Sequence, residues 1–201
     1  MGPISVKDIS NSDSIGNLRE LLGSADSSKL DSHQRIALNF LKGNPNISGT
    51  KVHRSLGGSF YDFANNRLGL HSDSPDILAH ELGHAARLAD ASKEYKSLLS
   101  AAKRVSSINN MVSMPIASLI ALNKNMEYES KKHALRNLAL VSAGISSPNL
   151  LEELAASYHA VKNSDSPMRT TIGMVPGIVS HSLNDLSAPL TYAAVNKLVK
   201  E

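Results

Sequence analysis

The sequence predicts an α+β protein that is mostly helical. Strand-like patterns are confined to residues 50–70, where short runs of β-branched and aromatic residues alternate with turn residues. From residue 75 to the end, apolar residues recur at helical spacing. The chain has 201 residues, 41% of them hydrophobic and 19% charged, which is typical of an ordinary folded domain. We therefore expect a small sheet followed by a helical bundle, in a single domain over residues 31–201.

The N-terminal region divides into an arm and a helix. Residues 1–30 are rich in Ser, Asp and Gly and contain one short helical pattern at 15–22, so we expect a loosely attached arm. A helix capped by Asp31 and Ser32 follows and should stop at Gly43. The residues expected on its inward face are Ile36, Leu38, Phe40 and Leu41.

The strand region should form three segments. Thr50–His53 reads as one strand, and Ser59–Phe63 with Arg67–Leu70 as the arms of a hairpin turned at Asn65–Asn66. An exposed edge of such a sheet could bind an extended peptide by main-chain hydrogen bonds. A purely structural hairpin is the alternative, and the sequence leaves both open.

Two apolar segments, Met111–Leu122 and Leu135–Ile145, lie on either side of the charged run 124–133. Each is shorter than the roughly 18–20 residues that a membrane-spanning helix needs. We therefore expect buried core helices. A hairpin that dips into a membrane or packs on a partner is the less favoured alternative.

The C-terminal region should contain further helices. One runs from Asn149 to Lys162 after an N-cap at Ser147. The next segment should break at Pro176–Gly177, because proline and glycine interrupt helices. A final helix should begin at its cap, Ser187.

The chemistry of the chain centres on residues 80–84, His-Glu-Leu-Gly-His, which match the pattern H-E-x-x-H. Ser74 as N-cap and Pro75 at the first position predict a helix here, one that runs on towards Lys103-Arg104. On a helix, residues four apart lie on one face, so both imidazoles can bind one zinc ion. Glu81 would stand beside the ion as a general base. A chance occurrence of the pattern on a buried helix is the alternative.

Zinc held by two histidines needs a third protein ligand. Asp90 is disfavoured, because in an unbroken helix it would point away from His84. Glu153 is the favoured candidate and Glu152 the second, since the small residues after Glu153 would allow its helix to approach the histidines closely. Ser157, on the same face as Glu153, is a candidate partner for a ligating imidazole. A pair of solvated surface acids is the alternative for both glutamates.

These motifs resemble the gluzincin class of metallopeptidases and, within it, the YugP-like neutral zinc metallopeptidases. The similarity rests on residues 79–84, on the E-x-x-A-S pattern at residues 153–157, on Tyr61-Asp62 and on a late Thr191-Tyr192-Ala193, and it extends over roughly residues 33–200. The resemblance implies a zincin-like (minigluzincin) fold with the sheet packed on the active-site helix. It implies zinc held by His80, His84 and Glu153, with Glu81 as the base. It also implies membrane association, from which the short, interrupted apolar segments of this chain depart.

The predicted function is zinc-dependent cleavage of peptide bonds, with a peptide or protein as substrate. His181 and Tyr192 are candidates, on residue type alone, for stabilising the oxyanion. The alternative is a non-catalytic interaction or assembly protein, with a structural or vestigial zinc site, that could belong to an oligomer or a larger particle.

Composition limits the partners, the metal sites and the cellular location that we expect for the protein. The formal net charge of +3 is too small and too evenly spread to indicate a nucleic-acid partner. The chain has no cysteine, so disulfides and thiolate metal sites are excluded. Residues 1–7 show no apolar core of a secretory signal. We expect a cytoplasmic or otherwise intracellular protein, with peripheral membrane or particle association as the alternative.

Overall fold

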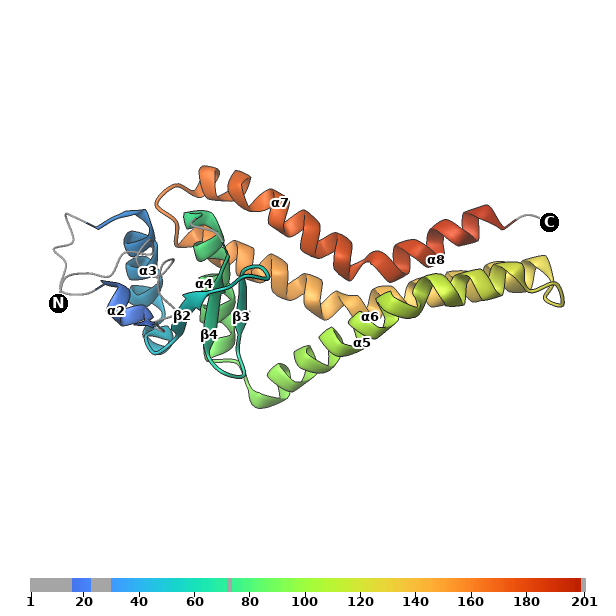
Figure 1. Ribbon diagram of the computed structural model, residues 1–201, viewed down its shortest axis with the longest axis horizontal. Coiled ribbons are helices and arrows are strands. Elements are labelled where there is room, and N and C mark those ends of the chain that lie inside the picture. The colour runs from blue at the N-terminus through green and yellow to red at the C-terminus, as the bar shows by residue number, and fades with distance from the viewer. Residues whose placement is uncertain (1–15, 23–29, 72–73, 200–201) are drawn as a thin grey trace. The chain divides into compact units, whose positions relative to one another are not determined.

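The structure is a computed structural model and describes residues 16–22, 30–71 and 74–199 (Figure 1). These residues form an α+β fold that is mostly helical and contains a four-stranded sheet, as expected at that level. The chain divides into two compact units. The first unit consists of Met1–Ser92 with Leu154–Ile178, and the second of Lys93–Glu153 with Val179–Glu201. That residues 31–201 form a single domain stays a prediction.

The sheet belongs to the first unit and has the strand order β1-β2-β4-β3. Its strands are β1 (Gly16–Asn17), β2 (Lys51–Arg54), β3 (Phe60–Asp62) and β4 (Arg67–Leu70). β3 and β4 pair antiparallel, which confirms the predicted hairpin, whereas β2 and β4 pair parallel. The strand expected at residues 50–53 lies at 51–54.

Part of the expected N-terminal arm is packed on this sheet. β1 pairs antiparallel with β2, and Leu18 at the start of α2 (Leu18–Leu22) is fully buried in the apolar core. The helix expected at 15–22 is therefore shorter and follows a strand. Residues 1–15 and 23–29 of the predicted arm lie outside the described residues.

The hairpin turn is held by Asn66, whose φ of 48° is left-handed. Thr50 Oγ1 and Tyr61 Oη both donate hydrogen bonds to Asn66 Oδ1, at 2.8 and 3.0 Å. Asparagine tolerates this backbone conformation better than most residues. The sequence signal at Asn65–Asn66 therefore located the turn correctly.

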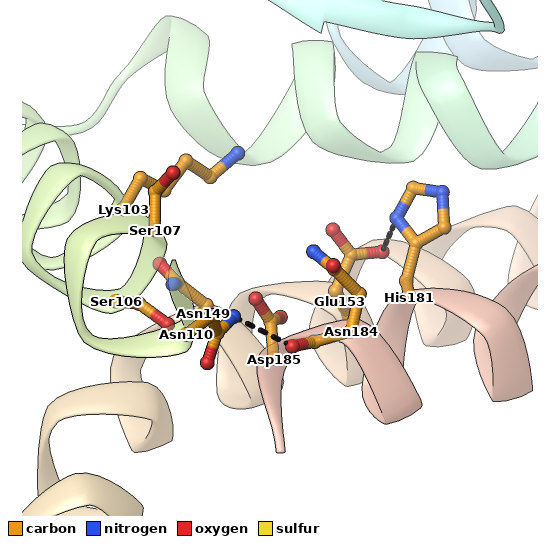
Figure 2. A pocket seen from close by; sticks show the side chains of 9 residues that line it. All are labelled: Lys103, Ser106, Ser107, Asn110, Asn149, Glu153, His181, Asn184 and Asp185. Carbon is orange, nitrogen blue, oxygen red and sulfur yellow. Dashed lines mark hydrogen bonds and ion pairs between the residues drawn. The ribbon is translucent and has the colours of Figure 1, made fainter. Parts of the chain in front are cut away.

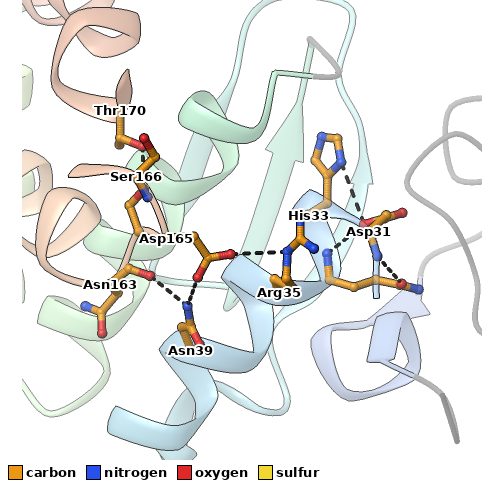
Figure 3. Close-up of polar contacts among 10 residues, drawn as sticks. Asp31, His33, Arg35, Asn39, Asn163, Asp165, Ser166 and Thr170 are labelled. Atoms are coloured by element: carbon orange, nitrogen blue, oxygen red, sulfur yellow. Dashed lines mark hydrogen bonds and ion pairs between the residues drawn. The ribbon is translucent and has the colours of Figure 1, made fainter. Parts of the chain in front are cut away.

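Helix α3 (Ser32–Gly43) begins as predicted. Asp31 is its N-cap, and its carboxylate accepts from the Gln34 backbone N–H while the Gln34 side chain accepts from the Asp31 N–H. Farther along, Arg35 Nε forms an ion pair with Asp165 at 3.2 Å and Asn39 Nδ2 donates to the same carboxylate at 2.8 Å (Figure 3). The buried residues are Gln34, Ile36, Ala37 and Phe40, whereas Leu38 and Leu41 are half-buried.

Helix α4 (Pro75–Ala89) has Ser74 at its N-cap position and Pro75 as its first residue, as predicted. It packs against α3 and against strands β3 and β4. The prediction that it runs on towards residues 103–104 is wrong. The helix ends at Ala89, and Asp90 at its C-cap accepts a hydrogen bond from Asn46 Nδ2 at 2.6 Å.

Four long helices follow: α5 (Lys93–Leu122), α6 (Tyr128–Lys162), α7 (Pro167–Asp185) and α8 (Ser187–Leu198). In the second unit, α5 and α8 lie side by side (Figure 1). A small apolar cluster joins these two helices to α6 and contains Ala117, Leu135, Ala188 and Tyr192. The predicted helical C-terminal half is confirmed, and the final helix begins at Ser187 with Leu186 as its N-cap.

Two predicted helix boundaries are wrong because α6 and α7 continue through Pro148 and Pro176. A proline inside a helix leaves the carbonyl four residues earlier without its N–H donor. At Pro148 that carbonyl belongs to Gly144, and Ser147 Oγ donates to it at 2.8 Å. Ser147 therefore bonds back to the preceding turn and does not cap a new helix.

The prediction that Met111–Leu122 and Leu135–Ile145 are buried core segments is also wrong. The exposed fractions of Met111, Leu119 and Leu122 are 76%, 73% and 77%. The buried positions of α5 are Leu99, Ser106, Ser113 and Ala117. This stripe is narrow and made mostly of small residues, so the larger apolar side chains remain outside. By length and composition α5 could cross a membrane, and 17% of its most apolar window is buried.

Candidate metal centre

The two histidines of the H-E-x-x-H motif lie together on α4. The ring centroids of His80 and His84 are 4.9 Å apart, and their planes are nearly perpendicular, at 87°. His84 is buried and His80 half-buried. Glu81 follows His80 on the same helix, and its side chain is 4% exposed. The helix thus places two imidazoles and one carboxyl group in a protected environment.

Gly83 allows α4 to approach α6 closely. A β-carbon at this position would overlap the backbone carbonyl of Ala156, and Ala156 itself is fully buried. Glycine is required here for lack of space, because the obstructing atoms belong to the backbone of α6 and cannot rotate away. The predicted close approach between small residues is confirmed.

Ser157 lies one residue farther along α6 and contacts the motif. Its Oγ lies 3.3 Å from His80 Nδ1. With Nδ1 occupied in this way, His80 could present Nε2 to a metal, and a hydrogen bond from Nδ1 would fix the orientation of the ring. The predicted contact between Ser157 and a histidine of the motif is present.

Glu153 completes a group of three potential metal ligands. One ligand atom each from His80, His84 and Glu153 lies within 4.8 Å of the other two, so this buried group could hold a metal ion. The boundary between the two units falls inside α6, directly after Glu153. Because α6 is unbroken, Glu153 stands one helical turn before Ser157 on the same face.

The chemistry of this donor set suits zinc. Two imidazoles and one carboxylate form a known ligand set of catalytic zinc, which keeps a fourth position open. Zinc bonds of about 2.1 Å in a tetrahedral arrangement place ligand atoms roughly 3.4 Å apart.

His181 on α7 contacts Glu153, the third potential ligand. Its Nδ1 lies 3.4 Å from Glu153 Oε2, and its side chain is half exposed. An imidazole that donates to a ligating carboxylate holds that carboxylate in one orientation. His181 therefore lies beside Glu153, and its expected role in stabilising the oxyanion stays a prediction.

The other candidates have different surroundings. Glu152 is buried and accepts a hydrogen bond from Tyr95 Oη at 3.0 Å. Asp90 is the exposed C-cap of α4. Tyr192 is buried in the apolar cluster of the second unit, and burial raises its pKa above the ordinary value. These are the surroundings of structural residues.

A polar cleft of about 630 Å³ lies in the second unit (Figure 2). It is lined from α5 by Lys103, Ser106, Ser107 and Asn110, from α6 by Asn149 and Glu153, and from α7 by His181, Asn184 and Asp185. Glu153 thus belongs both to the cleft and to the candidate metal ligands.

Lys103, Asn149 and Asp185 line the cleft but were not predicted from the sequence. A signal for two of them was present, because Asn149 precedes Glu153 by four residues and Asp185 follows His181 by four. That spacing places each pair on one helix face. Lys103 has no such relation to a recognised residue.

Asp185 has an altered acidity. Burial raises its pKa above the ordinary value, and the nearby charge of Glu153 raises it further. Lys103, His181 and a hydrogen bond from Asn149 act in the opposite direction but do not cancel the effect. The carboxyl group of Asp185 therefore responds to the charges that surround the cleft.

Comparison with known proteins adds no assignment. No family model matches this chain, and neither a curated protein nor a solved structure matches it.

Proposed function

We propose that the chain is a zinc-dependent peptidase. The observation that carries the proposal is the convergence of His80, His84 and Glu153, with ligand atoms within 4.8 Å of one another. The accompanying Glu81 is buried one residue after the first histidine, as the H-E-x-x-H mechanism requires. Two imidazoles, one carboxylate and one further acid are the minimal equipment for hydrolysis assisted by zinc.

Each residue of the site would have a separate role in hydrolysis. His80, His84 and Glu153 hold the zinc ion, and Ser157 and His181 orient two of these ligands. When bound, zinc polarises the scissile carbonyl and activates water. Glu81 takes a proton from the attacking water and passes it to the leaving nitrogen.

Strand β3 is the proposed docking edge for the substrate. It is the last strand in the order β1-β2-β4-β3, and α4 packs against it. An extended peptide can pair with the free side of an edge strand through main-chain hydrogen bonds. Recognition of this kind reads the peptide backbone and leaves side-chain preference to neighbouring groups.

The resemblance to a known class of metallopeptidases supports the proposal. The order of motifs is similar to that of gluzincins and of the YugP-like zinc metallopeptidases, which would make the arrangement zincin-like. The small sheet packed on α4, followed by the long helix α6 that carries Glu153, agrees with this proposal.

The test compares wild-type protein with the Glu81→Gln variant. Zinc content is measured by elemental analysis, and cleavage by mass spectrometry of a peptide library. We expect about one zinc per chain in both proteins. Cleavage should fall by at least a hundredfold in the variant, because the general base is lost. Undiminished cleavage by Glu81→Gln would refute the assigned base, and absence of zinc from both proteins would refute the metal centre.

The second candidate is an interaction protein whose metal has a structural role. The apolar side chains exposed on α5 and α6, among them Met111, Leu119 and Val141, favour this alternative. Removal of metal by a chelator separates the two functions. If the metal is catalytic, the protein should keep most of its thermal stability after chelation. If the metal is structural, the protein should unfold when the metal is removed.

A further inference from the structure

The polar cleft of the second unit could bind part of a ligand next to Glu153. Its lining residues all carry polar or charged side chains, and they come from α5, α6 and α7 (Figure 2). A volume of about 630 Å³ is large enough for a long side chain and part of a peptide backbone. The lining does not suit an apolar group, because its polar atoms would lose their hydrogen bonds to water.

One buried acceptor in this lining has no partner. Asn149 is 3% exposed, and its Oδ1 makes no hydrogen bond with any residue that the structure describes. A buried carbonyl oxygen without a donor costs about 1–3 kcal/mol. Asn149 Oδ1 is therefore suited to a ligand that brings an N–H group.

Charge in the cleft favours the same kind of ligand. Asp185 on α7 supplies a carboxylate, and Lys103 on α5 supplies the lysine ammonium that acts on it. The Lys103 side chain is exposed, so it can turn towards solvent and leave Asp185 to another cation. The charge of Glu153 is committed to the metal in the proposed function.

We propose that this cleft binds the cationic side chain of a lysine or arginine in the substrate. The ammonium or guanidinium group donates hydrogen bonds to the Asp185 carboxylate and to Asn149 Oδ1. The inference rests on the proposed function, because Glu153 belongs to both sites and links the cleft to the scissile bond. Asp185 is then the residue that determines specificity.

The experiment measures binding separately from cleavage. Zinc-loaded Glu81→Gln protein is titrated against fluorescein-labelled hexapeptides of Ala and Gly that carry one arginine at each position in turn. Matched peptides carry citrulline, which has nearly the same shape without the charge. Fluorescence anisotropy should show at least tenfold tighter binding of arginine than of citrulline at one position.

Two further variants, made in the Glu81→Gln protein, give opposite expectations. Asp185→Asn should reduce the preference for arginine to less than threefold, whereas Lys103→Gln should strengthen arginine binding by removing a competing cation. Glu129→Gln, which removes an exposed charge from the same unit, is the control. It should change neither the preference for arginine over citrulline nor the affinity for arginine peptides.

Equal binding of arginine and citrulline peptides would overturn the inference. An arginine preference that survives Asp185→Asn, or weaker arginine binding by Lys103→Gln, would do the same. Wild-type cleavage without a preference dependent on Asp185 would contradict the cleft but not the peptidase. A preference dependent on Asp185 without any cleavage would support the cleft and contradict the peptidase.

Discussion

Gly83 is the residue on which the distance between the motif helix and α6 depends. In Gly83→Ala, the new methyl group would overlap the carbonyl of Ala156, so the helices must separate. We expect a loss of about 2–3 kcal/mol in the free energy of unfolding, measured by urea denaturation. Weaker zinc binding should accompany it, because Ser157 and Glu153 would move away from the histidines.

Gly144 provides the matched control for Gly83. It also lies inside a helix, but a β-carbon there would meet nothing within 4 Å. Gly144→Ala should therefore stabilise the protein by about 1 kcal/mol, as helix propensity alone predicts. A similar loss of stability in both variants would show that Gly83 is not a special position.

Ser157 is expected to act on metal affinity through His80. Ser157→Ala removes the 3.3 Å contact between Ser157 Oγ and His80 Nδ1, so the ring loses its preferred orientation. We expect zinc affinity to fall by about tenfold to a hundredfold in competition with a chromogenic chelator. Ser130→Ala, at an exposed position of the same helix, should bind zinc like the wild type.

Asp62 should make the stability of the hairpin dependent on pH. Burial alone would raise the pKa of Asp62, but hydrogen bonds from Asn65, Arg67 and the Ala64 N–H outweigh it and lower the pKa. A lowered pKa in the folded state stabilises the protein fully above the ordinary value of 3.8. This stabilisation disappears as the pH falls through the lower, folded-state pKa.

The corresponding variant is Asp62→Ala. We expect it to lose about 1 kcal/mol of stability at pH 7, because several hydrogen bonds of the turn disappear. Urea denaturation at pH 7, 5 and 3 should show that the difference from wild type persists at pH 5 and shrinks at pH 3. A constant difference down to pH 3 would contradict the assigned role of the carboxylate.

At the scale of elements, Asn110 of α5 forms hydrogen bonds with the end of α7 and the start of α8. Its Nδ2 donates to the carbonyl of Asn184 at 2.7 Å, and its Oδ1 accepts from the backbone N–H of Ala188 at 3.1 Å. One side chain thus satisfies the end of one helix and the start of the next. Ser146 Oγ supports the same joint by donating to the Asp185 carbonyl at 2.5 Å.

The neighbouring asparagine offers a comparison for this joint. Asn110→Ala should cost about 1–2 kcal/mol, because both helix ends lose a partner. Asn109 Nδ2 is buried without a hydrogen-bond partner among the described residues, so Asn109→Ala should be neutral or slightly stabilising. Thermal unfolding of the two variants tests this difference, and an equal effect would contradict the role of Asn110.

Local signals in the sequence predicted the elements whose boundaries are set by local chemistry. The cap at Asp31 and the Ser74-Pro75 start were both predicted from the sequence, and both helices begin there. Pro148 does not end its helix as predicted, because Ser147 supplies the missing hydrogen bond to Gly144. Compensation of this kind depends on the conformation of one side chain, which a residue pattern does not reveal.

In the candidate site, too, local sequence predicts some residues and tertiary packing determines the others. The two histidines follow from spacing on one helix, and Glu153 follows from its small neighbours. Lys103 is brought to the cleft by the packing of α5, which no local pattern encodes. The exposure of large apolar residues on α5 could not be predicted either, since it depends on which narrow face the other helices cover.

At the scale of the whole molecule, zinc should raise thermal stability by mass action. Zinc at a hundred times its dissociation constant adds about 2.7 kcal/mol if it binds only the folded chain. We expect a higher melting temperature for the wild type with zinc than with chelator, measured by calorimetry. His84→Ala should show little difference between the two conditions, and an equal shift in this variant would place the metal elsewhere.

The division of the chain has a practical consequence for fragment design. Each unit is assembled from two separate stretches, so no single continuous fragment contains one whole unit without part of the other. A fragment that stops at Ser92 lacks Ala160 and Met174, which complete the apolar core around Leu82. A fragment of residues 93–153 likewise lacks Ala188 and Tyr192. Expression of half the gene should therefore yield insoluble or unfolded material, and isolated units would require co-expressed segments or a rewired order of the helices.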